Sequence, residues 1–168
     1  MRIPDVIQSE VRSPGRQRTD RLFVRLHDQH ENILRQIQLH LSKDGDNRIR
    51  DRRDIRSGHM TTGSFVQLRK LLAEHQREEE RIILPVVNVC LDSSASAAMR
   101  REYAHIREAL TKLKMKRMQA NRSYESLQEF LDSAEEFEAM VRRQFSREEN
   151  VIYWFASLYL AYSSSLPT

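Results

Sequence analysis

Apolar side chains recur every three or four residues through four long segments of the chain, and this spacing limits its fold more than any other feature. A period near 3.6 residues places apolar side chains on one face of a helix, and each such face must be buried against another. Only four Gly and four Pro occur among 168 residues, so strands with frequent turns are not indicated. The sequence therefore predicts an all-α protein, folded as an antiparallel up-down-up-down four-helix bundle. Three of the helices are expected at about residues 21–43, 95–118 and 124–162. The other, second along the chain, is expected to begin near Ser64 and to kink or end at Pro85.

The two ends of the chain lie outside this pattern. The first residues show little periodicity and are predicted to form a flexible arm, and Thr19 or Asp20 is expected to cap the first helix. Pro85 is expected to kink or end the second helix, because proline lacks the N–H that a helix interior uses. The predicted units are a flexible N-terminal arm, a four-helix bundle and a C-terminal tail, at residues 1–18, 19–162 and 163–168.

The composition indicates where in the cell this bundle is expected and whether it contacts a membrane. A single cysteine, Cys90, cannot form an intramolecular disulfide, and the first residues lack the apolar core of a secretory signal, which predicts a cytoplasmic protein. The longest apolar run, residues 151–162, is shorter than the roughly 20 residues that span a bilayer, so no membrane partner is expected. This run is more apolar than one buried face requires, and a homodimer formed through it is a hypothesis.

The net charge of +4 comes with two basic clusters, at residues 48–56 and 112–117. Clusters of this kind can bind the phosphates of nucleic acids. The first cluster, however, is interleaved with Asp, and the second is typical of a solvated helix end. No recognisable nucleic-acid-binding motif accompanies either of them, so nucleic acid is not expected as a partner.

Polar side chains interrupt the apolar stripe near the middle of every predicted helix. Antiparallel packing would bring the four interruptions to a similar depth, where they would meet. An unpaired carboxylate in that position is costly, whereas carboxylates and imidazoles gathered around a cation compensate one another. The interrupting residues, one or two to a helix, are His30, His75 with Glu79, His105, and Gln144 with Glu148.

These residue types predict a metal site. His75 and Glu79 are four residues apart and therefore share one face of a helix. Imidazole and carboxylate donors without thiolates suit iron, manganese or zinc, and carboxylates in helical bundles can bridge two metal ions. We therefore expect a two-metal site with vacant positions for a small exogenous molecule. Its expected bridging ligands are Glu79 and Glu148, and its expected terminal ligands are His30, His75 and His105.

The pattern resembles the hemerythrin-like family, also called the HHE cation-binding family. The likeness is carried by "DQHENIL", "EHQREEERIILP", "EYAHIREAL" and "QFSREENVIYWF", and it covers about residues 20–160. It implies a four-helix bundle that holds a non-haem di-iron centre with an oxo or hydroxo bridge, although the same donors suit another divalent metal. It also implies that the centre binds or senses dioxygen, nitric oxide or peroxide.

One position departs from the family pattern. The family places His-x-x-x-Glu on the fourth helix, and here Gln144 precedes Glu148. A Gln carbonyl is a weaker, neutral ligand, so one iron lacks a donor unless water, His27 or Glu102 supplies it. The alternative function is a metal-depleted bundle that acts as a protein-interaction or regulatory module through its basic loop and N-terminal arm. A ferritin-like protein is disfavoured, because its paired Glu-x-x-His motifs are absent.

No group of residues predicts catalysis. The sequence has no apparent Ser-His-Asp or Cys-His grouping, no Gly-rich phosphate loop and no zinc-type cysteine spacing, so no catalytic residue is assigned. Binding or sensing is expected rather than turnover, and any turnover would be peroxide or oxygen chemistry at non-haem iron. The aromatic residues Tyr103, Tyr124, Tyr153 and Trp154 are interpreted as packing residues. Tyr103 is near enough to His105 in the sequence to lie close to the site.

Overall fold

The chain folds into helices throughout the residues that the structure describes. The structure is a computed structural model, and it describes residues 14–41, 62–120 and 122–163. No strand occurs within these ranges, which confirms the all-α prediction. The first three helices are α1 (Pro14–Leu41), α2 (Thr62–Cys90) and α3 (Ser93–Gln119). The last helix is continuous and consists of α4 (Tyr124–Arg147), the π-turn η3 (Glu148–Ile152) and α5 (Tyr153–Ser163).

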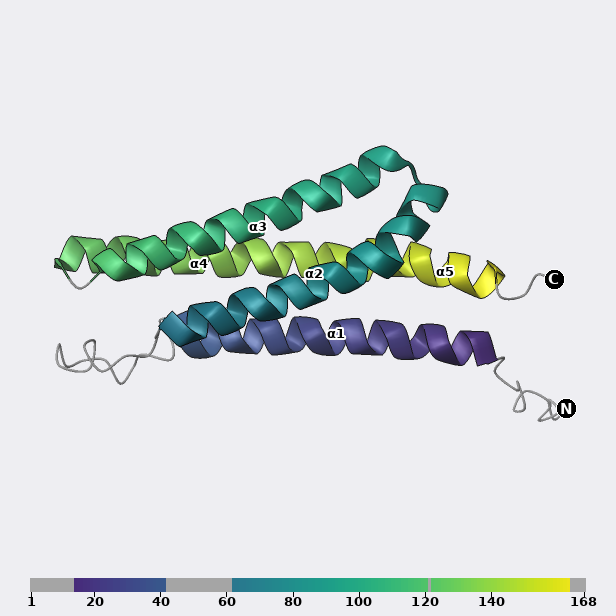
Figure 1. Cartoon of the computed structure of the whole chain (residues 1–168), viewed down its shortest axis with the longest axis horizontal. Coiled ribbons are helices and arrows are strands. Elements are labelled where there is room, and N and C mark those ends of the chain that lie inside the picture. Colours follow the sequence, from purple (N-terminus) through teal and green to yellow (C-terminus); the bar gives the residue numbers. More distant parts are fainter. Residues whose placement is uncertain (1–13, 42–61, 121, 164–168) are drawn as a thin grey trace, which may run out of the picture.

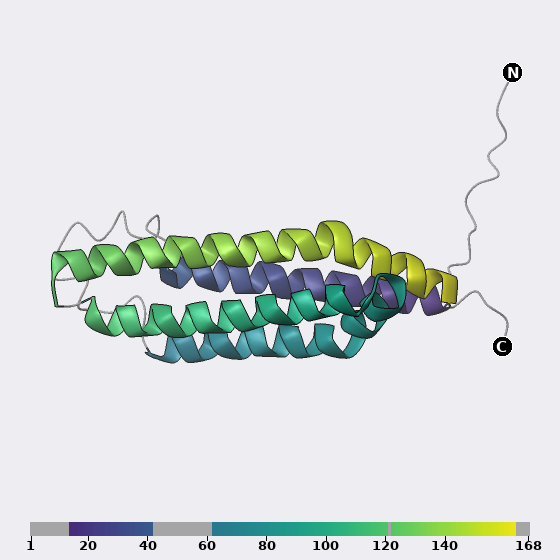
Figure 2. The ribbon, with the colours of Figure 1, turned by 90° about the horizontal axis from the view of Figure 1, so that it is seen from above.

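Consecutive helices run in opposite directions along the long axis of the molecule (Figure 1). α1 packs against α2 and α4, and α3 packs against the same two helices, so the four helices close a ring. Figure 2 shows them lying side by side over most of their length. The α5 extension continues this packing against α1 and α2. The predicted up-down-up-down bundle is therefore confirmed.

The predicted start of the first helix was wrong, and of the two alternatives for Pro85 the structure has the kink. α1 begins at Pro14 rather than at Thr19 or Asp20, and a proline fits the first helical position because the N–H there has no partner within the helix. Pro85 does not end α2, which continues to Cys90. α2 bends toward its C-terminal end in Figure 1, as a helix containing proline is expected to do. The predictions made for residues 1–13, for the basic loop at 42–61 and for residues 164–168 lie outside the described residues.

Side-chain caps set the two short turns around α3. The Asp92 carboxylate accepts hydrogen bonds from the backbone N–H groups of Ser94 and Ala95, at 2.7 and 2.9 Å. Ser123 caps α4 in the same way, with its hydroxyl 3.1 Å from the backbone nitrogen of Ser126. Such caps satisfy N–H groups that the first helical turn leaves unpaired. They fix where α3 and α4 begin, and therefore the depth of their inward side chains.

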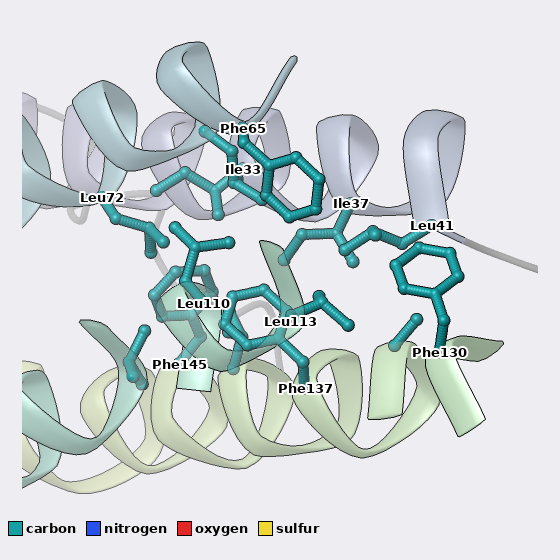
Figure 3. Close-up of a cluster of buried hydrophobic side chains, with 14 of the residues drawn as sticks. Ile33, Ile37, Leu41, Phe65, Leu72, Leu110, Leu113, Phe130, Phe137 and Phe145 are labelled. Atoms are coloured by element: carbon teal, nitrogen blue, oxygen red, sulfur yellow. The ribbon is translucent and has the colours of Figure 1, made fainter. Parts of the chain in front are cut away.

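The interior consists of two apolar clusters, one toward each end of the bundle. The first contains residues from α1 to α4, and Figure 3 shows their side chains meeting between the helices. Its members include Ile33, Ile37, Leu41, Phe65, Leu72, Leu110, Leu113, Phe130, Phe137 and Phe145. The second includes Leu26, Ile83, Leu84, Val87, Met99, Tyr103, Ile152, Tyr153 and Ala156. Each long helix passes from one cluster to the other near its middle, where the predicted polar residues lie.

Phe137→Ala is expected to lower the free energy of unfolding by roughly 3–5 kcal/mol, because it removes a large side chain from the first apolar cluster. Phe155→Ala is the matched control, since Phe155 is 37% exposed and its truncation is expected to cost much less. Urea unfolding of the metal-free proteins, followed by circular dichroism, measures both changes. Equal losses in the two variants would contradict the burial of Phe137 between the helices.

Within the described part of the chain, no helix combines the length and the apolar character needed to cross a bilayer.

Candidate metal centre

Four ligating side chains meet between the two apolar clusters. They are His30 of α1, His75 and Glu79 of α2, and Glu148 at the start of the π-turn. All four are buried, and one ligating atom from each lies within 4.8 Å of the others. The helices that supply them, α1, α2 and the last helix, pack against one another in the bundle (Figure 1). Side chains far apart in the sequence therefore form one compact polar group in the interior.

The spacing of these atoms is that of donors around one ion. His30 Nε2 lies 3.0 Å from His75 Nε2 and 3.2 Å from Glu148 Oε2. His75 Nε2 lies 3.4 Å from Glu79 Oε2 and 3.8 Å from Glu148 Oε2. Ligands bonded to one metal at about 2.1 Å are separated by roughly 3.0 Å at right angles and roughly 3.4 Å in a tetrahedron. A single metal ion therefore fits the space between them.

Hydrogen bonds at the outer nitrogens fix the protonation of both imidazoles. His30 Nδ1 lies 2.6 Å from the Glu149 carboxylate, and His75 Nδ1 lies 2.9 Å from the Gln29 side-chain oxygen. The orientation of the Gln29 amide follows from its nitrogen, which donates to Glu78 at 2.8 Å. Both partners of the Nδ1 atoms are thus acceptors, so each Nδ1 carries the proton. In the neutral imidazoles each Nε2 then presents a lone pair to the cluster.

The inner atoms of the cluster are arranged so that a cation would satisfy them. Two lone pairs at 3.0 Å repel, and the pair formed by His30 and His75 is favourable only with a cation or a proton between them. Glu148 Oε2 is buried and has no hydrogen-bond partner among the described residues. Buried oxygens of this kind are normally paired, because leaving one unpaired costs free energy. A metal ion would satisfy all three atoms at once.

The pKa values of the two buried carboxyl groups, Glu79 and Glu148, are shifted in opposite directions. Burial, together with the negative charge of Glu148, raises the pKa of Glu79 to about 7. Burial alone would also raise the pKa of Glu148. Hydrogen bonds and positive charge from the imidazoles of His30 and His75, when a proton lies on their Nε2 atoms, outweigh burial and hold that pKa below its usual value. Two carboxylates this close are both ionised more readily when a cation lies between them. The electrostatics therefore also favour a cation.

Two tyrosine hydroxyls complete the surroundings of Glu79. Tyr103 donates to Glu79 Oε2 at 2.5 Å, and Tyr153 donates to Glu79 Oε1 at 2.7 Å. Tyr153 Oη also lies 3.2 Å from His30 Nε2. Burial and the negative charges of Glu79 and Glu148 raise the pKa of both phenols above the ordinary value, so the hydroxyls keep their protons. Both tyrosines are thus hydrogen-bond donors to the cluster.

The π-turn η3 explains how three residues of the last helix, Glu148, Glu149 and Tyr153, all contact the cluster. The Tyr153 N–H donates to the Glu148 carbonyl, five residues earlier. In an α-helix, a residue five positions on is rotated by about 140°, but this longer turn places Tyr153 on the same face as Glu148. Glu149 meanwhile reaches the outer nitrogen of His30. Turns of this type are frequent at functional sites, and this one supplies a candidate ligand and two of its neighbours.

Comparison with protein families assigns this architecture. The family model described as hemerythrin HHE cation binding domain matches residues 21–156, which include all four grouped side chains. The chain belongs to the hemerythrin family. No curated protein and no solved structure matches it. The HHE domain is a cation-binding domain, and the buried His/Glu cluster is the group among the described residues that could hold the cation.

The HHE domain brings together four of the six predicted ligands, namely His30, His75, Glu79 and Glu148. His105 was expected to join them from the third helix, and that placement was wrong. Its side chain is exposed and lines a separate pocket between α3 and α4. Tyr103 instead faces the cluster, and a residue two positions further along a helix is rotated by about 200°. Tyr103 therefore lies beside the cluster, although His105, the residue that suggested its closeness to the site, does not.

Gln144, the sixth predicted ligand, lies beside the cluster, and both the nitrogen and the oxygen of its amide form hydrogen bonds. Its nitrogen donates to Glu148 Oε1, and its oxygen accepts from Arg147 at 2.8 Å. The proposed substitutes for the missing family His do not reach the interior of the HHE domain. His27 is exposed and contacts Glu149 at 2.9 Å, and Glu102 is ion-paired with Arg147.

Three residues around the cluster were missed, namely Gln29, Glu149 and Tyr153. Gln29 and Glu149 stand next to predicted ligands, and neighbours in sequence point about 100° apart on a helix, so the helical period does not place them on the ligand face. Polar residues adjacent to His30 and Glu148 were the available signal, since an imidazole bound to a metal usually donates its other N–H to a nearby acceptor. Tyr153 had no sequence signal, because its position depends on the π-turn.

Proposed function

We propose that this hemerythrin-family domain holds non-haem iron in its buried His/Glu cluster and binds or senses dioxygen, nitric oxide or a related small oxidant. The observation that carries the proposal is the close approach of His30 Nε2 and His75 Nε2, which lie 3.0 Å apart. Beside them is a buried Glu148 oxygen that has no hydrogen-bond partner among the described residues. Two imidazoles with carboxylate and no thiolate are the donor set typical of non-haem Fe(II) sites with open positions. The donor types thus favour iron.

The side chains around the cluster would prepare it for the ion. Iron bound there would supply electrons and a vacant position for a small oxidant. The imidazoles present neutral Nε2 atoms, because acceptors outside the cluster hold the Nδ1 protons. The hydroxyls of Tyr103 and Tyr153 orient Glu79 and offset its charge. The apolar clusters on either side exclude bulk water from the centre.

The proposal also concerns the number of metal ions that the cluster binds. The family resemblance implies two irons, whereas the four grouped donors are spaced for one ion. A second ion beside Glu148 would need the Gln144 oxygen, which already accepts a hydrogen bond from Arg147. A neutral amide oxygen is also a weaker ligand than an imidazole. We therefore expect the first iron to bind tightly, and a di-iron centre stays a prediction.

Gln144→His tests the second ion directly. It replaces the amide beside Glu148 with an imidazole, and we expect tightly bound iron to rise from about one toward two ions per chain. Gln128→His, elsewhere on α4, is the matched control and is expected to leave the iron content unchanged. Elemental analysis gives the stoichiometry. An iron content that stays near one ion per chain in Gln144→His would contradict this account of the second ion. About two ions per chain in both the unaltered protein and Gln144→His would mean that another residue already completes the second site.

Metal content and the absorption spectrum in air test the proposed function itself. Protein purified without chelator is expected to contain iron, and two irons with near-ultraviolet oxo-to-iron bands would support the di-iron form. Protein that contains no metal, and takes up none during anaerobic incubation with ferrous iron, would contradict the proposal.

One observation favours the alternative, a metal-depleted interaction module. Glu79 already accepts two tyrosine hydroxyls, and Glu148 Oε1 accepts the Gln144 amide, so the cluster is partly satisfied without metal. The end of the last helix also exposes apolar side chains at helical spacing, which a partner could cover. They are Val151, Trp154, Phe155 and Leu158. Unaltered thermal stability after chelation would support this alternative.

Two expectations from the sequence stay predictions. The homodimer would form through the same exposed apolar side chains, and light scattering on the purified protein measures the mass that decides it. The cytoplasmic location rests on the single Cys90, which is free and half-buried.

A further inference from the structure

A pocket of about 340 Å³ opens between α3 and α4, next to the metal cluster but outside it. Its wall is mixed, with apolar surface from Ile106 and Met140 and several polar or charged side chains. The polar and charged members are Glu102, His105, Arg143, Gln144 and Arg147. None of the four grouped ligands lines it, so the pocket is a separate compartment.

Gln144 forms the boundary between this pocket and the cluster. Its side chain lines the pocket, although the residue is only 6% exposed. Its amide nitrogen donates inward to the candidate ligand Glu148, and its oxygen accepts from Arg147 on the pocket side. One side-chain amide is therefore in contact with both the pocket wall and a candidate metal ligand. A molecule in the pocket would be one side chain away from the centre.

The charge of the pocket favours anions. Arg143 and Arg147 contribute two positive charges against the single carboxylate of Glu102, which is ion-paired with Arg147. Two neighbours of Arg143, namely Arg142 and Arg147, are ion-paired with Glu138 and Glu102, whereas Arg143 forms no ion pair with an acidic residue within the described part of the chain. Guanidinium groups bind oxyanions well, and a concave surface of one sign concentrates ions of the other sign.

We propose that this pocket is an anion-binding vestibule, through which a small inorganic monoanion approaches the metal centre past Gln144. The inference rests on the proposed function and narrows it, because it selects an anionic small molecule over a neutral gas as the ligand that uses this route. Arg143 supplies the attracting charge, and Arg147 holds the amide of Gln144 at the inner end.

The test compares two neighbouring arginines of α4. Arg143→Gln removes the unpaired charge of the pocket. Arg142→Gln is the matched control, because Arg142 is also exposed but bonds to Glu138 at 2.7 Å and does not line the pocket. Azide is the anionic probe, and its association with the ferric protein is followed by stopped-flow absorption. Nitric oxide, which is neutral, is the comparison probe on the ferrous protein.

We expect Arg143→Gln to slow azide association by roughly threefold to tenfold at low salt and to leave nitric oxide association unchanged. The difference should shrink at high ionic strength, where charges are screened over a few ångströms. Arg142→Gln should match the unaltered protein with both probes. Equal azide rates in the two variants would overturn the proposal, as would an equal slowing of azide and nitric oxide by Arg143→Gln.

A measurement on the metal-free protein keeps this inference separate from the proposed function. Azide is titrated while the side-chain amide resonance of Gln144 is observed by nuclear magnetic resonance. A saturable shift that Arg143→Gln abolishes would support the vestibule even if the protein takes up no iron. The absence of any saturable shift would overturn it, even if the iron centre itself is established.

Discussion

His75→Ala is expected to weaken iron binding by more than about 100-fold, because it removes a direct donor from the cluster. Losing an outer hydrogen-bond partner of a metal ligand typically costs roughly 10–100-fold in affinity, and losing a direct donor should cost more. The His75 nitrogen contributes the shortest distance in the cluster, 3.0 Å to His30. Competition with a chromophoric chelator measures the affinity, and circular dichroism establishes that the variant is folded.

His105→Ala is the control, because the sequence pattern predicts His105 as a ligand and the structure places it outside the cluster. His105 occupies the family's helix-three motif, but its side chain is exposed and outside the cluster. We expect this variant to keep the affinity of the unaltered protein within a factor of about two, as for a surface position. Equal losses of iron in His75→Ala and His105→Ala would contradict the placement of His105.

The bundle could be predicted because helical periodicity is a local property of the sequence. Every long helix shows it, and both core clusters consist largely of the side chains that the period selects. The position of the site along the bundle axis could be predicted from the same pattern. His30 and His75 interrupt the apolar rows of two helices that lie side by side and run in opposite directions. Two interruptions at matching depth in separate helices carry more information than either residue alone.

His105 was misplaced because it was predicted to interrupt the apolar stripe of its helix, whereas it lies to one side of that stripe. The buried row of α3 contains Tyr103, Ile106, Leu110 and Leu113. Taking about 100° per residue, His105 lies roughly 120° from the centre of this row. The helical period alone would therefore have placed it outside and Tyr103 inside, as the structure does.

The π-turn could not be predicted from periodicity. Extending the α4 row at about 100° per residue directs Val151 and Phe155 inward and Tyr153 outward. The structure has the reverse, with Val151 44% exposed and Tyr153 buried. The wider turn at Glu148–Ile152 shifts the register of everything after it. Tertiary contacts such as the hydrogen bond from Tyr153 to Glu79 accompany this register, and they are not local in sequence.

Glu149→Ala is expected to weaken iron binding by roughly 10–100-fold without removing any direct ligand. Glu149 accepts the Nδ1 proton of His30 at 2.6 Å and also contacts His27 at 2.9 Å. Burial alone would raise the pKa of Glu149, but its bonds to His30 and His27 hold that pKa below the usual value, so the carboxylate is ionised at neutral pH. An ionised acceptor keeps the proton of His30 on Nδ1 and its lone pair directed at the metal.

Two further variants distinguish this positioning role from a general disturbance of the π-turn. Glu149→Gln retains an acceptor oxygen, and we expect it to recover most of the affinity that Glu149→Ala loses. Asn150→Ala alters an exposed side chain of the same turn and is expected to leave the affinity unchanged. Chelator competition measures all three proteins under identical conditions. A loss in Asn150→Ala as large as in Glu149→Ala would assign the effect to the turn itself, because Glu149, and not Asn150, contacts the outer nitrogen of His30.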